Sequence, residues 1–89
     1  MNSTLTYNPL VMTVAEWIKK LRIHLDLTQA QMAQRVHVSL PTYQRWEYGS
    51  SRPGGPAMAL LDIEANEAGF DPPPEAYQIT YGPRRREGQ

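Results

Sequence analysis

Several features are missing from this 89-residue sequence, and each absence excludes a class of protein. There is no cysteine, so neither a disulfide framework nor a thiolate metal site can form. The two histidines, His24 and His37, lie 13 positions apart without a cluster of carboxylates, which is a poor basis for a metal site. No apolar run approaches the ~20 residues of a membrane-spanning helix, and residues 1–10 carry no basic residue of the kind that opens a signal peptide. We expect a soluble, cytoplasmic protein.

Catalytic patterns are also missing. The sequence has no nucleophile paired with a base, no pair of catalytic carboxylates and no glycine-rich phosphate loop, because Gly54-Gly55 is a lone turn signal. A chain of this length buries only ~60–65% of its unfolded surface, so it forms one compact domain. We therefore expect neither an enzyme nor a cofactor.

The formal net charge is zero, which at first argues against a nucleic-acid-binding protein. The charges are segregated along the chain, however. Residues 17–52 hold six Lys or Arg against two acids, and residues 53–83 hold five acids and no base. Residues 84–89 add three arginines against one acid. The basic segment predicts a surface for phosphate groups, and the acidic segment predicts the opposite side of the molecule.

Two capping boxes begin the first two predicted helices. Thr13 is followed three residues later by Glu16, and Thr28 is followed at the same spacing by Gln31. Apolar residues then recur on one helical face, at Val14, Trp17, Ile18, Leu21 and Leu25 in the first helix and at Met32, Ala33 and Val36 in the second. The pattern predicts helices over residues 14–25 and 29–36.

A third N-cap at Ser39, with Pro41 in the first turn, begins a helix over residues 40–48 that buries Tyr43 and Trp46 and ends at Gly49. Only residues 37–39 separate it from the second helix, with Val38 as an apolar plug. Such a pair of short helices is typical of a helix-turn-helix. A fourth helix is expected from Pro56 to just before Gly69, with apolar residues at Ala57, Leu60, Leu61, Ala65 and Ala68.

A larger set of residues matches a known pattern at fixed spacing. It comprises Leu21-Arg22, Leu27-Thr28-Gln29, Met32-Ala33, Val36, Val38-Ser39, Tyr43, Trp46-Glu47 and Gly49. With these residues, the segment 14–66 resembles the phage-repressor type of helix-turn-helix, the lambda-repressor-like or Cro-like family. The stretch from Trp46 to Leu61 is more weakly similar to small antitoxins and autorepressors of toxin–antitoxin modules. The resemblance implies an all-α bundle of four to five short helices that binds operator DNA as a homodimer.

The resemblance also implies roles for individual residues. Leu40, Pro41, Thr42, Gln44 and Arg45 would face the major groove, Thr28 and Gln29 would contact a phosphate, and Arg22 would form an ion pair with Glu47. The sequence departs from the family at His37 and Asp26, which stand where glycine is common and where φ is expected to be positive. It departs again at Leu40 and Pro41, which replace polar residues and reduce the expected number of hydrogen bonds to bases.

The predicted helix 40–48 gives these roles a chemical basis. Pro41, Gln44, Arg45 and Tyr48 share one face, opposite Tyr43 and Trp46. Arginine can pair with guanine and glutamine with adenine in the major groove, whereas Leu40 and Pro41 can pack on a thymine methyl. Further candidates for phosphate contacts are Lys19 in the first helix and four residues at and just after the end of the helix 40–48, namely Tyr48, Ser50, Ser51 and Arg52. For each of these residues the alternative is an ordinary solvated side chain or loop.

The ends of the chain differ from its middle. We expect an N-terminal arm over residues 1–12, the DNA-binding domain over residues 13–69 and a C-terminal extension over residues 70–89. Polar and apolar residues alternate in residues 4–7 and 76–81, which predicts either a short β pair or unstructured tails. The run Arg84-Arg85-Arg86 is either an arm on DNA or a solubilising tail.

Two functions remain open from the sequence alone. The first is a repressor or autorepressor, associated with the nucleoid, that binds double-stranded DNA at an inverted repeat as a dimer. The second is an antitoxin that neutralises a toxin protein and also represses its own operon. A toxin-like reading frame beside the gene would favour the antitoxin.

Overall fold

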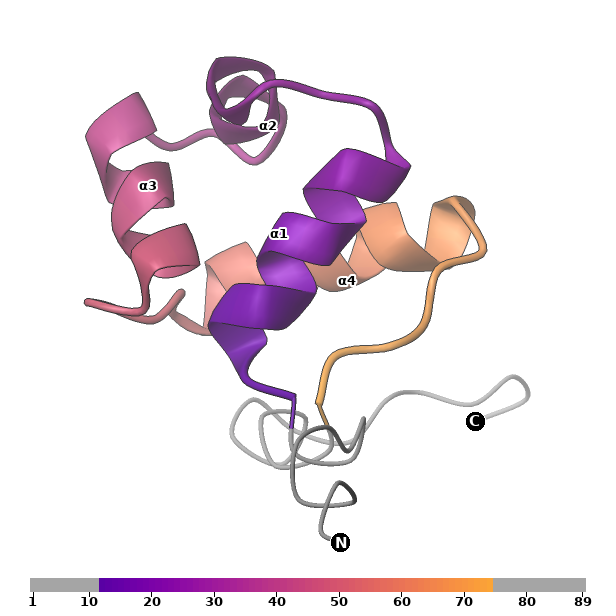
Figure 1. The fold of residues 1–89 in the computed structure, drawn as a ribbon. Coiled ribbons are helices and arrows are strands. Elements are labelled where there is room, and N and C mark those ends of the chain that lie inside the picture. Colours follow the sequence, from indigo (N-terminus) through magenta and orange to yellow (C-terminus); the bar gives the residue numbers. More distant parts are fainter. Residues whose placement is uncertain (1–11, 75–89) are drawn as a thin grey trace, which may run out of the picture.

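The computed structural model describes residues 12–74, which form four helices and no strand (Figure 1). The helices are α1 (Val14–His24), α2 (Gln29–Arg35), α3 (Leu40–Tyr48) and α4 (Gly55–Glu67). The all-α prediction is therefore confirmed for this part of the chain. None of these four helices is long and apolar enough to span a membrane. The strand pair expected at residues 4–7 and 76–81 lies outside the described residues.

The first three helices begin where their caps predict. The Thr13 hydroxyl accepts a hydrogen bond from the Glu16 amide at 3.1 Å, and the Thr13 amide donates to the Glu16 carboxylate at 3.0 Å. Thr28 and Gln31 repeat this reciprocal pair at 3.1 and 2.9 Å. Ser39 caps α3 by accepting from the amide three residues later, at 3.2 Å. Each cap supplies partners for backbone amides that the first turn of a helix leaves unpaired.

Three helix limits differ by one residue from the approximate limits that the sequence predicts. α1 ends at His24, not at Leu25; α2 ends at Arg35, because Val36 already has C-cap geometry; and α4 begins at Gly55, one residue before Pro56. Terminal turns are the part of a helix that local patterns define least well.

The core is built from the inner faces of all four helices. It contains Trp17, Ile18 and Leu21 of α1, Met32, Ala33 and Val36 of α2 and its cap, Tyr43 and Trp46 of α3, and Met58, Leu61 and Ala65 of α4. Val38 in the turn packs against this cluster as expected. Met58, which the expected apolar pattern of the fourth helix did not include, is buried, whereas Leu60, which it did include, is half-buried.

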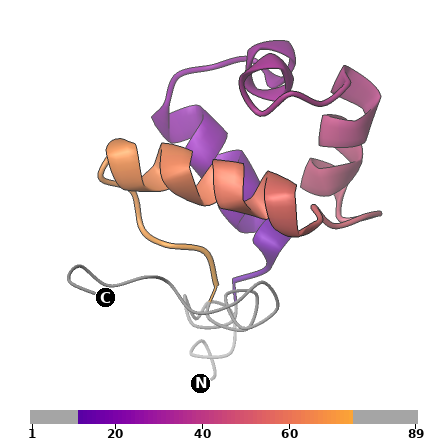
Figure 2. The same ribbon diagram turned by 180° about the vertical axis from the view of Figure 1, so that it is seen from behind.

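The chain after α4 returns along the bundle toward the start of α1, as both ribbon views show (Figures 1 and 2). Phe70 packs against the core and against the ring of His24, with 5.0 Å between centroids. The carbonyl of Asp71 accepts a hydrogen bond from the Trp17 indole at 3.0 Å, and Pro73 is buried. Residues 70–73 therefore pack on the helical bundle.

Two non-glycine residues have the left-handed backbone that the departures from the family pattern predict. They are Asp26, with φ of 61°, and His37, with φ of 62°. His37 lies between α2 and α3, where its amide donates to the Gln34 carbonyl at 3.2 Å. Gly49 has φ of 84° at the end of α3, where a side chain would be strained.

His37→Gly is expected to raise the free energy of unfolding by ~0.5–1 kcal/mol, because the left-handed conformation costs an L-residue ~1–2 kcal/mol and the entropy of glycine offsets part of that gain. Urea denaturation followed by circular dichroism measures the change. Lys19→Gly, at an exposed position in the middle of α1, is the control and should instead lower stability by ~1 kcal/mol. Equal losses in both variants would contradict the strain at His37.

Candidate nucleic-acid interface

α2 and α3 are joined by a turn of four residues, Val36 to Ser39, and cross on one side of α1 (Figure 1). The Val38 amide donates to the Ala33 carbonyl at 3.0 Å, which closes the turn, while the Val38 side chain fills the space between the helices. α3 is thereby held with Tyr43 and Trp46 turned into the core. The rings of these two residues meet edge to face, with 5.9 Å between centroids.

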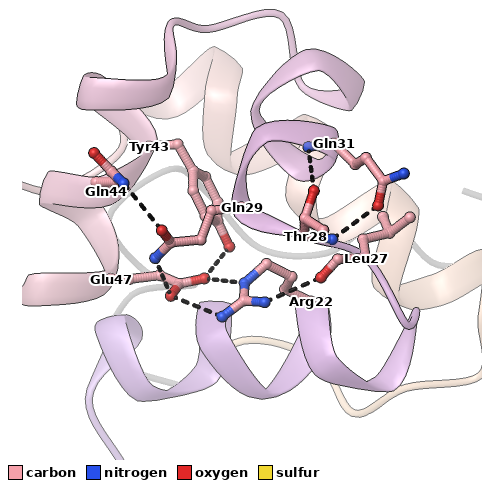
Figure 3. A network of polar contacts seen from close by, with 8 residues as sticks. All are labelled: Arg22, Leu27, Thr28, Gln29, Gln31, Tyr43, Gln44 and Glu47. Carbon is pink, nitrogen blue, oxygen red and sulfur yellow. Dashed lines mark hydrogen bonds and ion pairs between the residues drawn. The ribbon is translucent and has the colours of Figure 1, made fainter.

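The carboxylate of Glu47 links α3 to both other helices of this unit (Figure 3). Arg22 of α1 donates to its two oxygens, from Nε at 2.6 Å and from Nη2 at 3.2 Å. Gln29 of α2 donates from Nε2 at 3.0 Å, and the hydroxyl of Tyr43 donates from one turn earlier on α3. The Glu47 side chain is 3% exposed and that of Arg22 is 16% exposed. We call these four residues the Glu47 network.

Protonation states in the Glu47 network follow from burial and pairing. Burial opposes the charge on Glu47, but hydrogen bonds from Arg22, Tyr43 and Gln29 outweigh it and lower the pKa of this carboxyl. The hydrogen bond with Glu47 raises the pKa of Arg22, and burial followed by the same partner raises the pKa of Tyr43. At neutral pH the carboxylate is thus ionised and its donors keep their protons.

Gln29 connects the Glu47 network to the exposed side of α3. While its Nε2 donates to Glu47, its Oε1 accepts a hydrogen bond from Nε2 of Gln44 at 3.0 Å (Figure 3). The amide of Gln44 is therefore oriented by a residue that is itself fixed. The Gln44 side chain is half-buried, and its own carbonyl oxygen points away from this contact (Figure 3).

The predicted base-contacting residues lie on the first two turns of α3. Leu40, Pro41 and Arg45 are exposed, whereas Thr42 and Gln44 are half-buried. The Thr42 hydroxyl accepts from the Ser39 hydroxyl at 2.9 Å, so that it belongs to the cap of α3 as well. The helix thus presents an apolar pair at its start and an arginine one turn later.

The residues predicted to contact phosphate fall into two groups. Thr28 and Gln29, at the start of α2, already have protein partners: Thr28 is the cap of its helix, and Gln29 bridges Glu47 and Gln44. The others are largely at the surface, with Lys19, Tyr48, Ser50 and Arg52 exposed and Ser51 half-buried. Tyr48 is 73% exposed at the end of α3.

The sequence reasoning missed two connections of the site. The contact between Tyr43 and Glu47 has a signal, since residues four apart lie on the same helical face. The bridge from Gln44 through Gln29 to Glu47 has none, because it depends on the distance between α2 and α3. Among residues 12–74, no group of three His, Asp or Glu side chains comes together as metal ligands.

Comparison with known families decides the class of this protein. A model of the helix-turn-helix family, of the Cro/C1 type, matches residues 18–62, which is half of the chain. The chain belongs to this helix-turn-helix family. The matched segment runs from α1 into α4 and contains the whole Glu47 network, and membership makes the protein a DNA-binding transcription regulator. No curated protein and no solved structure gives a significant match.

Proposed function

We propose that this helix-turn-helix protein is a transcriptional repressor that binds an inverted-repeat operator as a homodimer, with α3 in the major groove. The observation that carries the proposal is the exposed face of α3, where the exposed Arg45 follows a Gln44 amide that Gln29 orients. In a two-fold dimer, two such helices would enter successive major grooves about 34 Å apart. Occupation of the operator would then exclude polymerase.

Base contacts are assigned to the first two turns of α3. Arg45 can donate two hydrogen bonds to O6 and N7 of guanine, and Gln44 can accept from or donate to adenine through the part of its amide that Gln29 leaves open. Leu40 and Pro41 offer an apolar surface to a thymine methyl group, and Thr42 lies between them and Gln44 on the same turn. This set gives specificity with few direct hydrogen bonds.

Phosphate contacts are assigned to the rim of the same surface. An amide nitrogen carries two hydrogens, so Gln29 can donate to a phosphate while it also donates to Glu47. Beyond α3, Tyr48, Ser50, Ser51 and Arg52 follow one another along the chain, and Lys19 lies one turn before Arg22 on α1. The Thr28 hydroxyl, which accepts from its own helix, can still donate.

Charge supports this orientation. The segment 17–52, which contains most of α1 and all of α2 and α3, has a surplus of four positive charges, whereas all four charged residues of the described segment 53–74 are acidic. A regulator with this polarity would approach DNA with α2 and α3 first, and the acidic side would weaken non-specific binding.

Arg45→Ala is expected to weaken binding to the selected operator by ~1–3 kcal/mol and to relax the preference at one base pair in each half-site. Arg35→Ala is the matched control: it removes the same charge, but its side chain is directed at Glu64 of α4, with 2.9 Å between Nε and Oε1. Fluorescence anisotropy on the operator and on single-base variants measures both. Equal losses from the two variants, with no change in preference, would contradict the assignment.

The function itself is tested by selecting bound fragments from a random DNA pool at low salt, followed by a reporter assay downstream of the selected site. Enrichment of an inverted repeat and a fall in reporter expression are expected. If no sequence is enriched, binding to a protein such as a toxin becomes the main function instead. An inverted repeat that leaves expression unchanged or raises it would contradict repression while keeping the DNA interface.

A further inference from the structure

α4 is apolar on two opposite faces. Its inner face buries Met58, Leu61 and Ala65. On its outer face Pro56, Ala59 and Ile63 are exposed at helical spacing, Leu60 is half-buried beside them, and Ile63 is 51% exposed. Figure 2 shows that this helix lies in front of α1 in that view, and no other segment of the described residues passes over its outer side. Exposed apolar side chains that are neighbours on one helical face can mark an interaction site.

The charges of α4 are all at one end. Residues 55–61 carry none, whereas residues 62–67 include Asp62, Glu64 and Glu67. At the other end, the N-cap is Gly54, which has no side chain to accept from the first amides, and the first turn contains no acid. The N-terminal end of a helix favours a negative charge, which α4 does not supply for itself.

We propose that the outer face of α4 pairs with the same face of a second copy of the chain, with the two helices antiparallel about a two-fold axis close to Ala59. This assigns the dimer surface of the proposed repressor and so rests on that function. The small side chain of Ala59 allows close approach at the axis, and Ile63 of each copy lies opposite Pro56 of the other. The face is then complementary to itself, as a two-fold interface requires.

Charge selects the antiparallel arrangement. Parallel helices would bring Asp62, Glu64 and Glu67 of one copy beside the same residues of the other. In the antiparallel arrangement the acidic end of each helix lies over the uncharged half of its neighbour, and Glu67 reaches the uncapped N-terminal end. The antiparallel arrangement therefore buries the apolar face and also keeps the acidic ends of the two helices apart.

The size of the face sets the expected strength. Three turns of one helix bury less than the ~1,200–2,000 Å² that is usual in stable complexes, so we expect association that depends on concentration in the micromolar range. Sedimentation equilibrium, from low micromolar to near-millimolar protein, should show a monomer–dimer equilibrium. A monomer throughout this range would overturn the proposal.

A matched pair of variants locates the interface. Ile63→Glu should weaken dimerisation at least ten-fold, because it places a charge in the apolar contact. Ile23→Glu is the control, since Ile23 is 57% exposed but lies on α1, and it should leave dimerisation unchanged. Circular dichroism verifies that both variants are folded. Equal dissociation constants for Ile63→Glu and the unmodified protein would place the interface elsewhere.

Because the chain has no cysteine of its own, a single introduced cysteine can test the antiparallel arrangement by disulfide cross-linking. Ala59→Cys, next to the axis, should form a disulfide-linked dimer under mild oxidation, since a disulfide needs two Cα atoms within ~7 Å. Asn66→Cys should not, because the two copies of this residue would be about 20 Å apart along the helices. Cross-linking at Asn66 alone would indicate a different register and contradict the proposed one.

Failure of this inference and failure of the repressor proposal give different results. A dimer that Ile63→Glu disrupts, in a protein that enriches no DNA fragment, would support the α4 interface and contradict the repressor. Enrichment of an inverted repeat by a protein whose dimerisation is insensitive to Ile63→Glu would support the repressor and contradict the α4 interface.

Discussion

Glu47→Ala is expected to lower the free energy of unfolding by about 2–4 kcal/mol. Removal of one partner from a buried ion pair typically costs ~3–5 kcal/mol, because the other charge stays buried without compensation. Here the cost is lower, since Arg22 is 16% exposed and also donates to the Leu27 carbonyl at 3.0 Å. Tyr43 and Gln29 lose a hydrogen-bond acceptor in the same step. Urea denaturation followed by circular dichroism measures the loss.

The second ion pair of the described residues is the control for this result. Arg35 and Glu64 are 2.9 Å apart, but their side chains are 48% and 18% exposed, so Glu64→Ala should cost less than ~1 kcal/mol. A double variant, Arg22→Met with Glu47→Leu, should recover much of the loss, since no charge is left unpaired. If Glu47→Ala costs no more than Glu64→Ala, the Glu47 network does not stabilise the fold.

The pH dependence follows from the lowered pKa of Glu47. A carboxyl whose pKa is lower in the folded than in the unfolded state stabilises the fold above its unfolded value of 4.5, and this contribution is lost as the pH falls through the folded value. The cost of Glu47→Gln should therefore be larger at pH 7 than in acid below the folded pKa. A cost that does not change with pH would contradict a depressed pKa.

Under the proposed function, the Glu47 network also links stability to DNA binding. Glu47 orients Gln29, and Gln29 orients Gln44, so the same carboxylate that joins the helices fixes one of the proposed base contacts. A buried ion pair of this kind contributes to orientation as much as to stability. Protonation of Glu47 would therefore weaken the contact that orients Gln29 and, through it, the proposed base contact at Gln44.

The sequence predicted most of the fold because its signals are local. Thr13 and Thr28 begin capping boxes within four residues, and Gly49 marks the end of α3 by a backbone conformation that other residues avoid. The positive φ of Asp26 and His37 was expected from the resemblance, because these residues stand where the family commonly has glycine. These features need no knowledge of the rest of the molecule.

What was missed depends on distances between helices. The place of Gln29 between Glu47 and Gln44 is set by the crossing of α2 and α3, which no pattern within α2 encodes. The return of the chain over Trp17, through the Asp71 carbonyl, lies in a segment that the sequence marked only as a C-terminal extension. Tertiary packing determines both the position of Gln29 and the path of the chain over Trp17, and local propensity does not predict tertiary packing.

Trp46→Ala is expected to have the largest effect of any single substitution on α3, a loss of about 3–5 kcal/mol in the free energy of unfolding. Trp46 is only 5% exposed and packs edge to face on Tyr43, which itself is fully buried. Because a domain of this size is marginally stable, this loss would leave much of the protein unfolded. Trp46→Leu, which keeps an apolar side chain, should remain folded with a smaller loss.

The alternative role for Trp46 is a platform on which DNA bases stack, and the two roles predict opposite pairs of results. If Trp46 is a core residue, Trp46→Ala is destabilised, whereas Trp46→Leu remains folded and still binds the operator. A stacking platform gives a stable variant that has lost affinity for DNA. Tyr48→Ala, at the 73% exposed end of the same helix, should change stability by less than ~0.5 kcal/mol and serves as the control. Arg45 and Tyr48 lie on the exposed face of α3, and Trp46 lies on its buried face, so the exposed face is left for the proposed contacts with bases and phosphates. A stable Trp46→Ala variant that does not bind DNA would reverse the assignment of the buried and the exposed face.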